Sequence, residues 1–323
     1  MKKLYSLLFT LLLTAGVLAG CGTSTEKPKE STGEKTESVQ KDESAFPVTI
    51  KDALDNEVVI DAKPERIVSL IPSNTEIAFG LGLSKQVVGV SDYDNYPAEA
   101  NEKEKIGGMD FNVEKILSLS PDLVLAHASY AEGSKDALQQ LRDSGITVFV
   151  VNNATNFDQV FDSIGIIGKI TGEKEKADEI ISDMKENLEE IIAKAKEIKE
   201  EDRKSVFIEV SPAPEIYAAG KNTFMDEILH LIHAENVVTE ENWPKIDPEA
   251  IIEKNPDVII TTHGYYTEDP IGQVLSREGW QDVAAVKNKR VVDIDSERIN
   301  RTGPRLVEGV EDLAKAIYPE TFK

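Results

Sequence analysis

NVEKILSLSPDLVLA (112–126) and DPEAIIEKNPDVIIT (247–261) are two copies of one pattern, placed 135 residues apart. In each copy a glutamate precedes the proline of a Pro-Asp pair by seven residues, and an apolar run follows that pair. Proline cannot continue a helix, and an unbroken apolar run is typical of a buried parallel strand. Each copy therefore predicts a short capped helix, a stop at proline and then such a strand. The match is short, but its shared register predicts two halves of duplicated architecture.

Outside the two copies, short β-rich runs alternate with helical segments, which is typical of α/β folds. Further helices are expected between the strands, with one near 223–232 and a closing one near 304–317. The expected strands are 66–70, 87–90, 122–126, 147–151, 205–210, 257–261 and 290–294.

Polar residues mark two local features of the first half. The run VTIKDALDNEVVI (48–60) predicts a hairpin, because Asp55 and Asn56 favour a turn between its two β-rich arms. Ser73 or Asn74 is expected to cap the next helix, since either side chain can accept a hydrogen bond from the first helical turn.

One long helix is expected between the halves, from Glu175 to Glu200. At 1.5 Å per residue it would be roughly 40 Å long, enough to span two lobes. A coiled-coil dimer is the rival interpretation. We rank it below a monomer, because the apolar stripe ends after about three heptads. The apolar residues recur at steps of three and four, on one face, at Ala177, Ile180, Ile181, Met184, Leu188, Ile191, Ile192, Ala195 and Ile198.

The first 20 residues match a secretory signal. Two lysines precede an apolar run at 7–18, which is shorter than the about 20 residues that a transmembrane helix needs. The run ends in LAGC (18–21), the pattern of a bacterial lipobox, in which the thiol of Cys21 receives a diacylglycerol. An ordinary signal peptide with a chance cysteine is the alternative. We expect a protein anchored by lipid to the extracytoplasmic face of the cell membrane.

Residues 21–45 have no aliphatic side chain larger than that of Val39. Such a segment cannot bury enough apolar surface to offset the entropy lost on ordering. We therefore expect a disordered tether between the lipid anchor and the folded body.

Composition and motifs exclude several classes of function. The formal net charge of −23 disfavours nucleic acid as a partner, because its phosphates would be repelled. Cys21 is the only cysteine, so intramolecular disulfides and cysteine metal clusters cannot form. The chain has no GxSxG elbow, Walker A loop, HExxH pair or GxGxxG loop after a strand. We predict no catalytic residues, no metal site and no resident cofactor.

Two of the four histidines are candidates for a binding site. His127 and His263 lie six and seven residues after the two repeated prolines, just beyond a predicted strand. Ligands of open α/β sheets bind beyond the carboxyl ends of the strands, so both could face one cleft. The alternative is two loop histidines without a special role. His230 and His233 have a spacing that can chelate a metal, but their apolar neighbours favour an ordinary packed or surface helix.

Aromatic residues gather in the predicted loops, although they make up only 6% of the chain. Rigid aromatic walls suit clefts for large planar ligands, and the set carries more weight than any member. The residues are Tyr93, Tyr96, Phe111, Tyr130, Trp243, Tyr265 and Tyr266.

Glu114 and Glu249 occupy equivalent positions in the first turns of the two repeated helices. An acidic side chain there is stabilised by the helix dipole, typically by about 0.3–1 kcal/mol, which is a sufficient structural reason for it. The functional interpretation is a pair of acidic contacts, one per lobe, for basic sockets on a partner.

Three stretches together resemble the cobalamin and iron-complex class of ABC importer binding proteins. The likeness covers nearly all of residues 47–323 and implies two Rossmann-like α/β lobes with parallel-rich sheets, joined by a single long α-helix. This is the class III periplasmic-binding-protein architecture, here with lobes at 46–170 and 203–323 and the helix within 171–202. It also implies transfer without chemistry to an ABC permease dimer and its ATPase. The stretches are RIVSLIPSNTEIAFGLGL (66–83) with VVGVSDYDNYP (87–97), GGMDFNVEKILSLSPDLVLA (107–126) and NWPKIDPEAIIEKNPDVIITTH (242–263).

Within this class the likeness is strongest to the vitamin B12-binding members. It implies that Tyr93 and Tyr96 are wall residues of the cleft and that Trp243 precedes the second docking helix. In SERINRTGPRLVEGV (296–310), it implies that Glu297 and Arg301 lie at the mouth of the cleft.

The same likeness bears on four further positions. Glu114 and Glu249 match the two docking glutamates of the family. The sequence departs from the B12 binders at His127, where some of them have tryptophan, and near Phe111, where a tryptophan is missing.

The expected ligand is a corrinoid, chiefly cobalamin, held between the lobes. A ferric siderophore is an alternative, because Arg298, Arg301 and Arg305 could meet an anionic chelate. Haem is another, with His127, His263 or a tyrosine as axial ligand. A cell-surface enzyme is the hypothesis from a different class.

Overall fold

The structure, a computed structural model, describes residues 46–323. The predicted signal, Cys21 and the predicted tether lie outside the described residues. Among residues 46–323, none of the helices combines the length and the apolar character that crossing a membrane requires.

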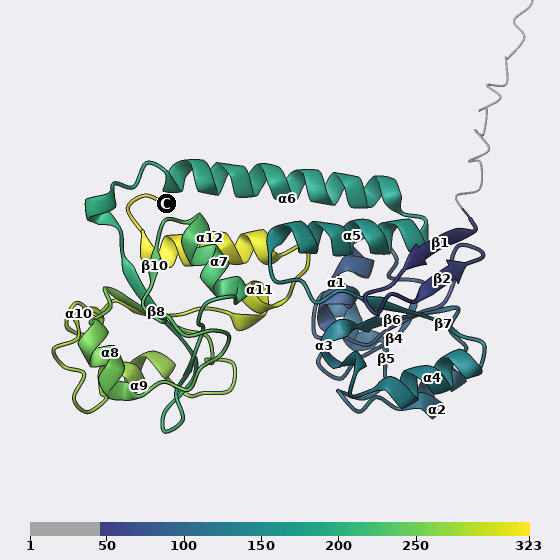
Figure 1. The fold of residues 1–323 in the computed structure, drawn as a ribbon, viewed down its shortest axis with the longest axis horizontal. Helices are drawn as coiled ribbons and strands as arrows, with labels where there is room; N and C mark the ends of the chain where they lie inside the picture. The colour runs from purple at the N-terminus through teal and green to yellow at the C-terminus, as the bar shows by residue number, and fades with distance from the viewer. Residues whose placement is uncertain (1–45) are drawn as a thin grey trace, which may run out of the picture. The chain divides into compact units, whose positions relative to one another are not determined.

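A parallel sheet forms the first half, in the strand order β5-β4-β3-β6-β7. This half lies at the right of Figure 1. A separate antiparallel hairpin precedes it, formed by β1 (Val48–Lys51) and β2 (Glu57–Ile60) as predicted. The sheet strands are β3 (Ile67–Ser69), β4 (Val87–Val90), β5 (Glu104–Lys105), β6 (Leu123–His127) and β7 (Thr147–Val151). The helices of this half are α1 (Pro72–Gly80), α2 (Val113–Ser118), α3 (Ala128–Ala131), α4 (Lys135–Asp143), α5 (Phe157–Thr171) and a 3-10 turn at Ala98–Glu102.

The second half has a sheet in the order β10-β8-β11-β12, with β9 paired antiparallel to β8. Its strands are β8 (Ser205–Ser211), β9 (Tyr217–Ala218), β10 (Glu235–Asn236), β11 (Val258–Thr261) and β12 (Val291–Asp293). Its helices are α7 (Phe224–Leu231), α8 (Pro248–Lys254), α9 (Pro270–Leu275), α10 (Ala284–Lys287), α11 (Ser296–Asn300), α12 (Leu306–Ile317) and a 3-10 turn at Glu200–Asp202.

The predicted duplication is present in three dimensions. The order β4-β3-β6-β7 of the first half corresponds to β10-β8-β11-β12 of the second, and all of these neighbours are parallel. In the repeated segments, Asp122 accepts a hydrogen bond from the backbone N–H of Arg66, and Asp257 accepts one from that of Ser205. Each aspartate thus holds the start of the strand next to its own.

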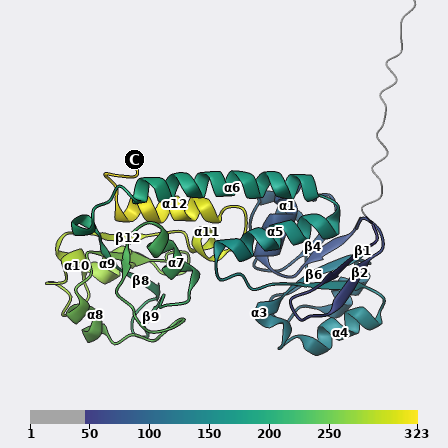
Figure 2. The ribbon, with the colours of Figure 1, turned by 45° about the horizontal axis from the view of Figure 1, so that its top comes forward.

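The long helix α6 (Lys174–Ala195) lies across both halves, with α5 beneath it in the first and α12 beneath it in the second (Figures 1 and 2). Its 22 residues correspond to roughly 33 Å, less than the predicted length. Ile198 continues the apolar pattern because its side chain is buried too, but it lies in a turn after the helix has ended. The pattern therefore predicted too long a helix.

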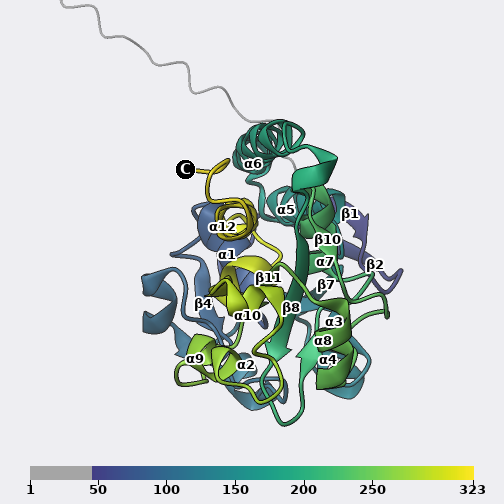
Figure 3. The same ribbon diagram turned by 90° about the vertical axis from the view of Figure 1, so that its left-hand side faces the viewer.

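The apolar stripe of α6 is covered by α5 and α12, which the end-on view shows below it on either side (Figure 3). Together they enclose a hydrophobic core that continues from one half into the other. Phe157 of α5 and Phe224 of α7 meet in this core, with ring centroids 5.0 Å apart in an edge-to-face arrangement. The halves are therefore joined by packing as well as by the helix.

The predicted cap of α1 is wrong. The helix begins at Pro72, and its N-cap residue is Ile71, which makes no side-chain capping bond. Proline suits this position because it lacks the N–H that would need a partner. The side-chain amide of Asn74 is buried and donates instead to the carbonyl of Ala126, at 3.0 Å. It ties α1 to the end of β6.

Candidate functional site

A cavity of about 350 Å³ lies between the two halves. The residues that line it follow the carboxyl ends of β3, β6 and β7 in the first half and come from α7, α11 and a loop in the second. Open α/β sheets bind ligands at this edge. The lining residues are Ile71, Pro72, Ser73, His127, Ser129, Asn153, Ala154, Thr155, Asn222, Thr223, Phe224, Asn242, Trp243, Asn300, Arg301 and Thr302.

His127 lies in this wall as the last residue of β6 and the N-cap of α3. Its Nδ1 lies 3.2 Å from the backbone nitrogen and 2.8 Å from the hydroxyl oxygen of Ser129. The side chain is almost fully buried, and burial lowers its pKa to about 4. The imidazole is therefore neutral at ordinary pH.

Trp243 faces the same cavity from the second half, and 48% of its surface is exposed. Its loop is bound to the backbone after β9, since the N–H of Gly220 donates to the carbonyl of Asn242 at 2.8 Å and the N–H of Lys221 donates to that of Glu240 at 2.7 Å. A Cβ at position 220 would lie 2.2 Å from the carbonyl oxygen of Glu240, so only glycine permits this approach.

Arg301 reaches the cavity from the residue after α11, but its guanidinium is already engaged. Nη1 donates to Glu76 at 3.0 Å and to Asn95 at 2.7 Å, while Nη2 donates to the carbonyl of Tyr93 at 3.2 Å and to Glu297 at 2.7 Å. Three of these partners belong to the first half. Arg301 therefore connects the halves at the cavity edge.

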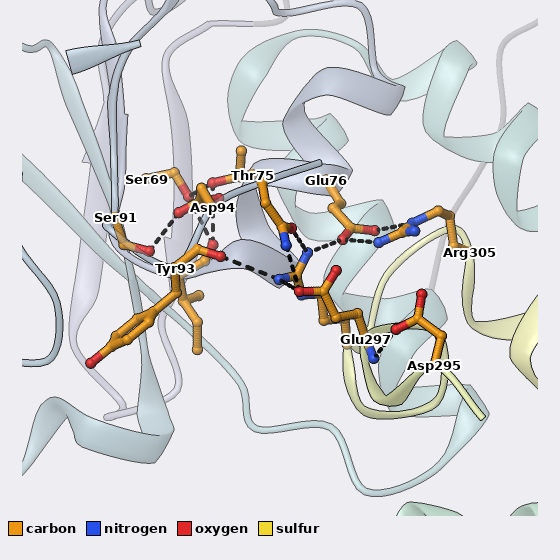
Figure 4. A network of polar contacts seen from close by, with 12 residues as sticks. Ser69, Thr75, Glu76, Ser91, Tyr93, Asp94, Asp295, Glu297 and Arg305 are labelled. Atoms are coloured by element: carbon orange, nitrogen blue, oxygen red, sulfur yellow. Dashed lines mark hydrogen bonds and ion pairs between the residues drawn. The ribbon is translucent and has the colours of Figure 1, made fainter. Parts of the chain in front are cut away.

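Arg305 completes this ion network, in which Glu76 of α1 and Arg305 point toward one another (Figure 4). The guanidinium also lies over the ring of Tyr96, 3.6 Å from its centroid. Tyr96 and Arg305 line a different cavity, of about 410 Å³. Tyr96 is thus not brought to the cavity that contains His127 and Trp243.

Hydrogen bonds of the buried residue Asp94 hold the segment that carries Tyr93 in place. The buried carboxylate of Asp94 accepts from the hydroxyl of Ser91 at 2.5 Å, and Lys105 donates to the carbonyl of Asp94 at 2.6 Å. Burial raises the pKa of Asp94. The ring of Tyr93 is turned away from Glu76 and is exposed (Figure 4).

Two predicted cleft residues are buried in their own halves. Phe111 packs in the core of the first half, where it is 8% exposed. His263 is completely buried, and its Nε2 lies 3.2 Å from Glu209 of β8. The prediction that His263 faces the cleft is wrong for this structure, because the side chain compensates a buried carboxylate.

Glu209 is the centre of that buried cluster, and Arg277 binds it at two points, 2.7 and 2.9 Å. Burial alone would raise the pKa of Glu209, but the hydrogen bonds from His263 and Arg277 outweigh it and lower the pKa. A glutamate within the apolar run SVFIEV (205–210) was the overlooked signal, since a buried charge requires partners. Tyr265 and Tyr266 follow His263 and are exposed.

The remaining candidates lie at the surface. Glu114 and Glu249 are exposed in the first turns of α2 and α8, which Figures 1 and 3 show away from α6. His230 bonds the carbonyl of Asp226, and His233 lies after the end of α7. Within the described part of the chain, no group of three or more His, Cys, Asp or Glu side chains is arranged to hold a metal ion.

Residues 67–298 match the family model described as periplasmic binding protein. An uncharacterized ABC transporter substrate-binding lipoprotein of Bacillus subtilis is 48% identical over 324 residues, covering 100% of both chains. A cobalamin-binding protein of Halobacterium salinarum is 30% identical over 287 residues, covering 86% of this chain and 76% of that protein.

Among solved structures, a "possible … iron-binding (periplasmic solute-binding) protein" from Staphylococcus epidermidis has a TM-score of 0.71 and 37% identity, covering 79% of this chain and 99% of that one. The paired α/β halves and the long helix are the class III architecture. The chain therefore belongs to the periplasmic binding protein family, a family of solute-binding proteins, and is the substrate-binding component of an ABC transporter.

Proposed function

We propose that this protein binds a corrinoid, cobalamin, in the cavity between its halves and delivers it to an ABC permease dimer and its ATPase. It carries no resident cofactor, acts as a monomer, and is held at the extracytoplasmic face by a lipid on Cys21. The observation that carries the proposal is the chemistry of the cavity wall.

Nine of the sixteen residues that line that wall carry an amide or a hydroxyl group. Four asparagines contribute to it, and none of the described residues that line it carries a carboxylate. An amide side chain both donates and accepts hydrogen bonds. Cobalamin presents a rim of amide groups around its corrin ring, so this lining complements it. The asparagines are Asn153, Asn222, Asn242 and Asn300.

The charge of the wall favours the same ligand over an anionic chelate. Arg301 is the cationic residue in the described lining, and its two terminal nitrogens already make four hydrogen bonds. Arg298 is paired with Glu308 and Asp312. A ferric siderophore with carboxylate or catecholate groups would have to compete for Arg301, and this would leave the buried carboxylate of Glu76 without one of its cations.

Trp243 supplies an apolar surface for a planar ligand. Its side chain is about half exposed, which leaves area for stacking on a macrocycle. The similarity to a cobalamin-binding relative supports this assignment.

An iron complex is the second candidate. The similarity to the Staphylococcus epidermidis protein and the presence of His127 in the cavity wall favour it.

Calorimetric titration of the lipoprotein in detergent with cyanocobalamin tests the proposal. We expect one site with a micromolar or lower Kd, and a loss of affinity of at least about tenfold in Trp243→Ala, the size that one buried aromatic contact supports. Leu54→Ala, in the exposed turn of the β1–β2 hairpin, is the control and should bind normally. Absence of binding to cyanocobalamin, together with binding of hemin or a ferric siderophore, would transfer the assignment to an iron complex.

A further inference from the structure

The capping role of His127 determines which of its ring nitrogens carries the proton. The backbone N–H of Ser129 lies 3.2 Å from Nδ1 and can only donate a hydrogen bond. Nδ1 must therefore present its lone pair. The hydroxyl of Ser129, at 2.8 Å from the same nitrogen, can donate or accept and is compatible with that assignment.

In a neutral imidazole, a lone pair on Nδ1 places the proton on Nε2. Burial keeps the ring neutral, since it lowers the pKa of His127 to about 4. Across residues 46–323, no hydrogen bond engages Nε2, and Nε2 is not one of the enclosed polar atoms that lack a partner. The small exposed part of this side chain therefore includes Nε2, in the wall of the cavity.

We propose that His127 presents Nε2–H to the cavity as a hydrogen-bond donor to a carbonyl oxygen of the bound solute, and that it does not serve as an axial ligand to a metal centre. The inference rests on the proposed function only in that the cavity receives the solute. The amide oxygens of a corrinoid are acceptors of the required kind.

Axial ligation through Nε2 would require the opposite tautomer. The proton would then lie on Nδ1, where it would face the backbone N–H of Ser129, and α3 would lose its capping bond. The hydroxyl of Ser129 could accept from Nδ1–H, but the backbone N–H would remain opposed. The cap thus makes His127 a donor and disfavours it as a ligand.

Two variants distinguish the capping role of Nδ1 from the donor role of Nε2. His127→Asn retains an oxygen in the position that caps the N–H of Ser129, because asparagine is a preferred N-cap, but it removes the Nε2 donor. His127→Gln places an amide N–H₂ near the position of Nε2 and restores a donor. Unfolding temperatures of both variants, compared with that of the natural protein, report whether the fold is retained.

The probes are cyanocobalamin, whose upper axial position is closed by cyanide, and aquacobalamin, whose axial water can be exchanged. We expect both to bind the natural protein with similar affinity, and the visible bands of aquacobalamin to be the same bound and free. The affinity of His127→Asn for each corrinoid should be lower by about tenfold, which is the size of one hydrogen bond. His127→Gln should recover most of that affinity.

Other outcomes overturn the inference. A shift of the visible bands of aquacobalamin on binding that disappears in His127→Asn would identify His127 as an axial ligand. Unchanged affinity of His127→Asn for both corrinoids would leave the residue with no donor role. If neither corrinoid binds the natural protein, the proposed function fails. Binding of hemin then tests the role of His127. A Soret shift lost in His127→Asn refutes the donor role, whereas weaker hemin binding with unaltered iron ligation supports it.

Discussion

Glu76 and Arg305 form a two-point ion pair that joins the two halves of the protein. Nη2 of Arg305 lies 2.6 Å from one carboxylate oxygen of Glu76, and Nε lies 2.9 Å from the other. Only 2% of the Glu76 side chain is exposed, and its carboxylate also forms an ion pair with Arg301. The pair links α1 to the start of α12 and lines the cavity that also contains Tyr96.

Glu76→Gln should destabilise the protein strongly. The change leaves Arg301 and Arg305, both mostly buried, without the carboxylate that they share, and breaking a buried pair in this way costs about 3–5 kcal/mol. Urea unfolding followed by circular dichroism measures the free energy. Arg298→Gln is the control, because the pairs of Arg298 with Glu308 and Asp312 are more exposed and should contribute at most about 1 kcal/mol. Equal effects of the two changes would argue against a special role for Glu76.

The neutral state of His127 makes stability depend on pH. In the folded protein burial lowers its pKa from the ordinary value of 6.5 to about 4, so between these values the unfolded chain binds more protons than the native state. The contribution of this group to stability is complete above pH 6.5 and is lost as the pH falls toward 4. It is on the order of 3 kcal/mol.

A comparison of two proteins isolates that contribution. The free energy of unfolding of the natural protein should fall more between pH 7 and pH 4.5 than that of His127→Asn, which cannot titrate there. Parallel pH dependence of the two proteins would contradict the assignment of a neutral, buried imidazole.

Glu209 and Glu215 provide a matched pair for the buried cluster of the second half. The pKa of each is lowered by cationic partners, but Glu209 is fully buried between His263 and Arg277, whereas Glu215 pairs with Lys245 at the surface. Glu209→Gln should cost about 3 kcal/mol or more, because it leaves Arg277 without its carboxylate. Glu215→Gln should have no measurable effect. Thermal unfolding of the two variants checks this contrast, and a comparable loss in both would refute it.

Charge reversal of Glu114 and Glu249 together should reduce uptake while leaving the Kd for ligand nearly unchanged. Both carboxylates are exposed, and exposed charges at a docking surface act mainly on association rate and salt dependence. Transport of ligand into vesicles that contain the permease and its ATPase provides the measurement. Glu253→Lys, a single change on the exposed surface of the same helix as Glu249, is the control. Normal uptake by the double variant would remove these glutamates from the docking surface.

The local elements could be predicted because each one has its own signal in neighbouring residues. Pro121 and Pro256 end their helices, and the apolar runs that follow form β6 and β11 as expected. The shared register of the two copies reflects a real correspondence of strand order. Helix α5 was not predicted individually, although Asn156 caps it and Gly172, with a φ of +74°, ends it.

The placement of the site residues could not be predicted to the same extent. His127 and His263 have almost the same relation to their repeated prolines, yet one lines the cavity and the other is enclosed by Glu209 and Arg277. Tyr93 and Tyr96 are three residues apart, but only the second stacks on Arg305. Glu209 lies 54 residues from His263 in the chain, and Arg305 lies more than 200 residues from Tyr96.

The sequence by itself determined the α/β class, the duplicated halves and the long helix between them, because these depend on periodicity and on proline and capping residues that act over a few positions. Only the tertiary structure decided which charges are shared between the halves and which side chains reach the cavity. Such pairing depends on the burial of groups from distant segments, and the cost of leaving a buried charge without a partner selects their arrangement.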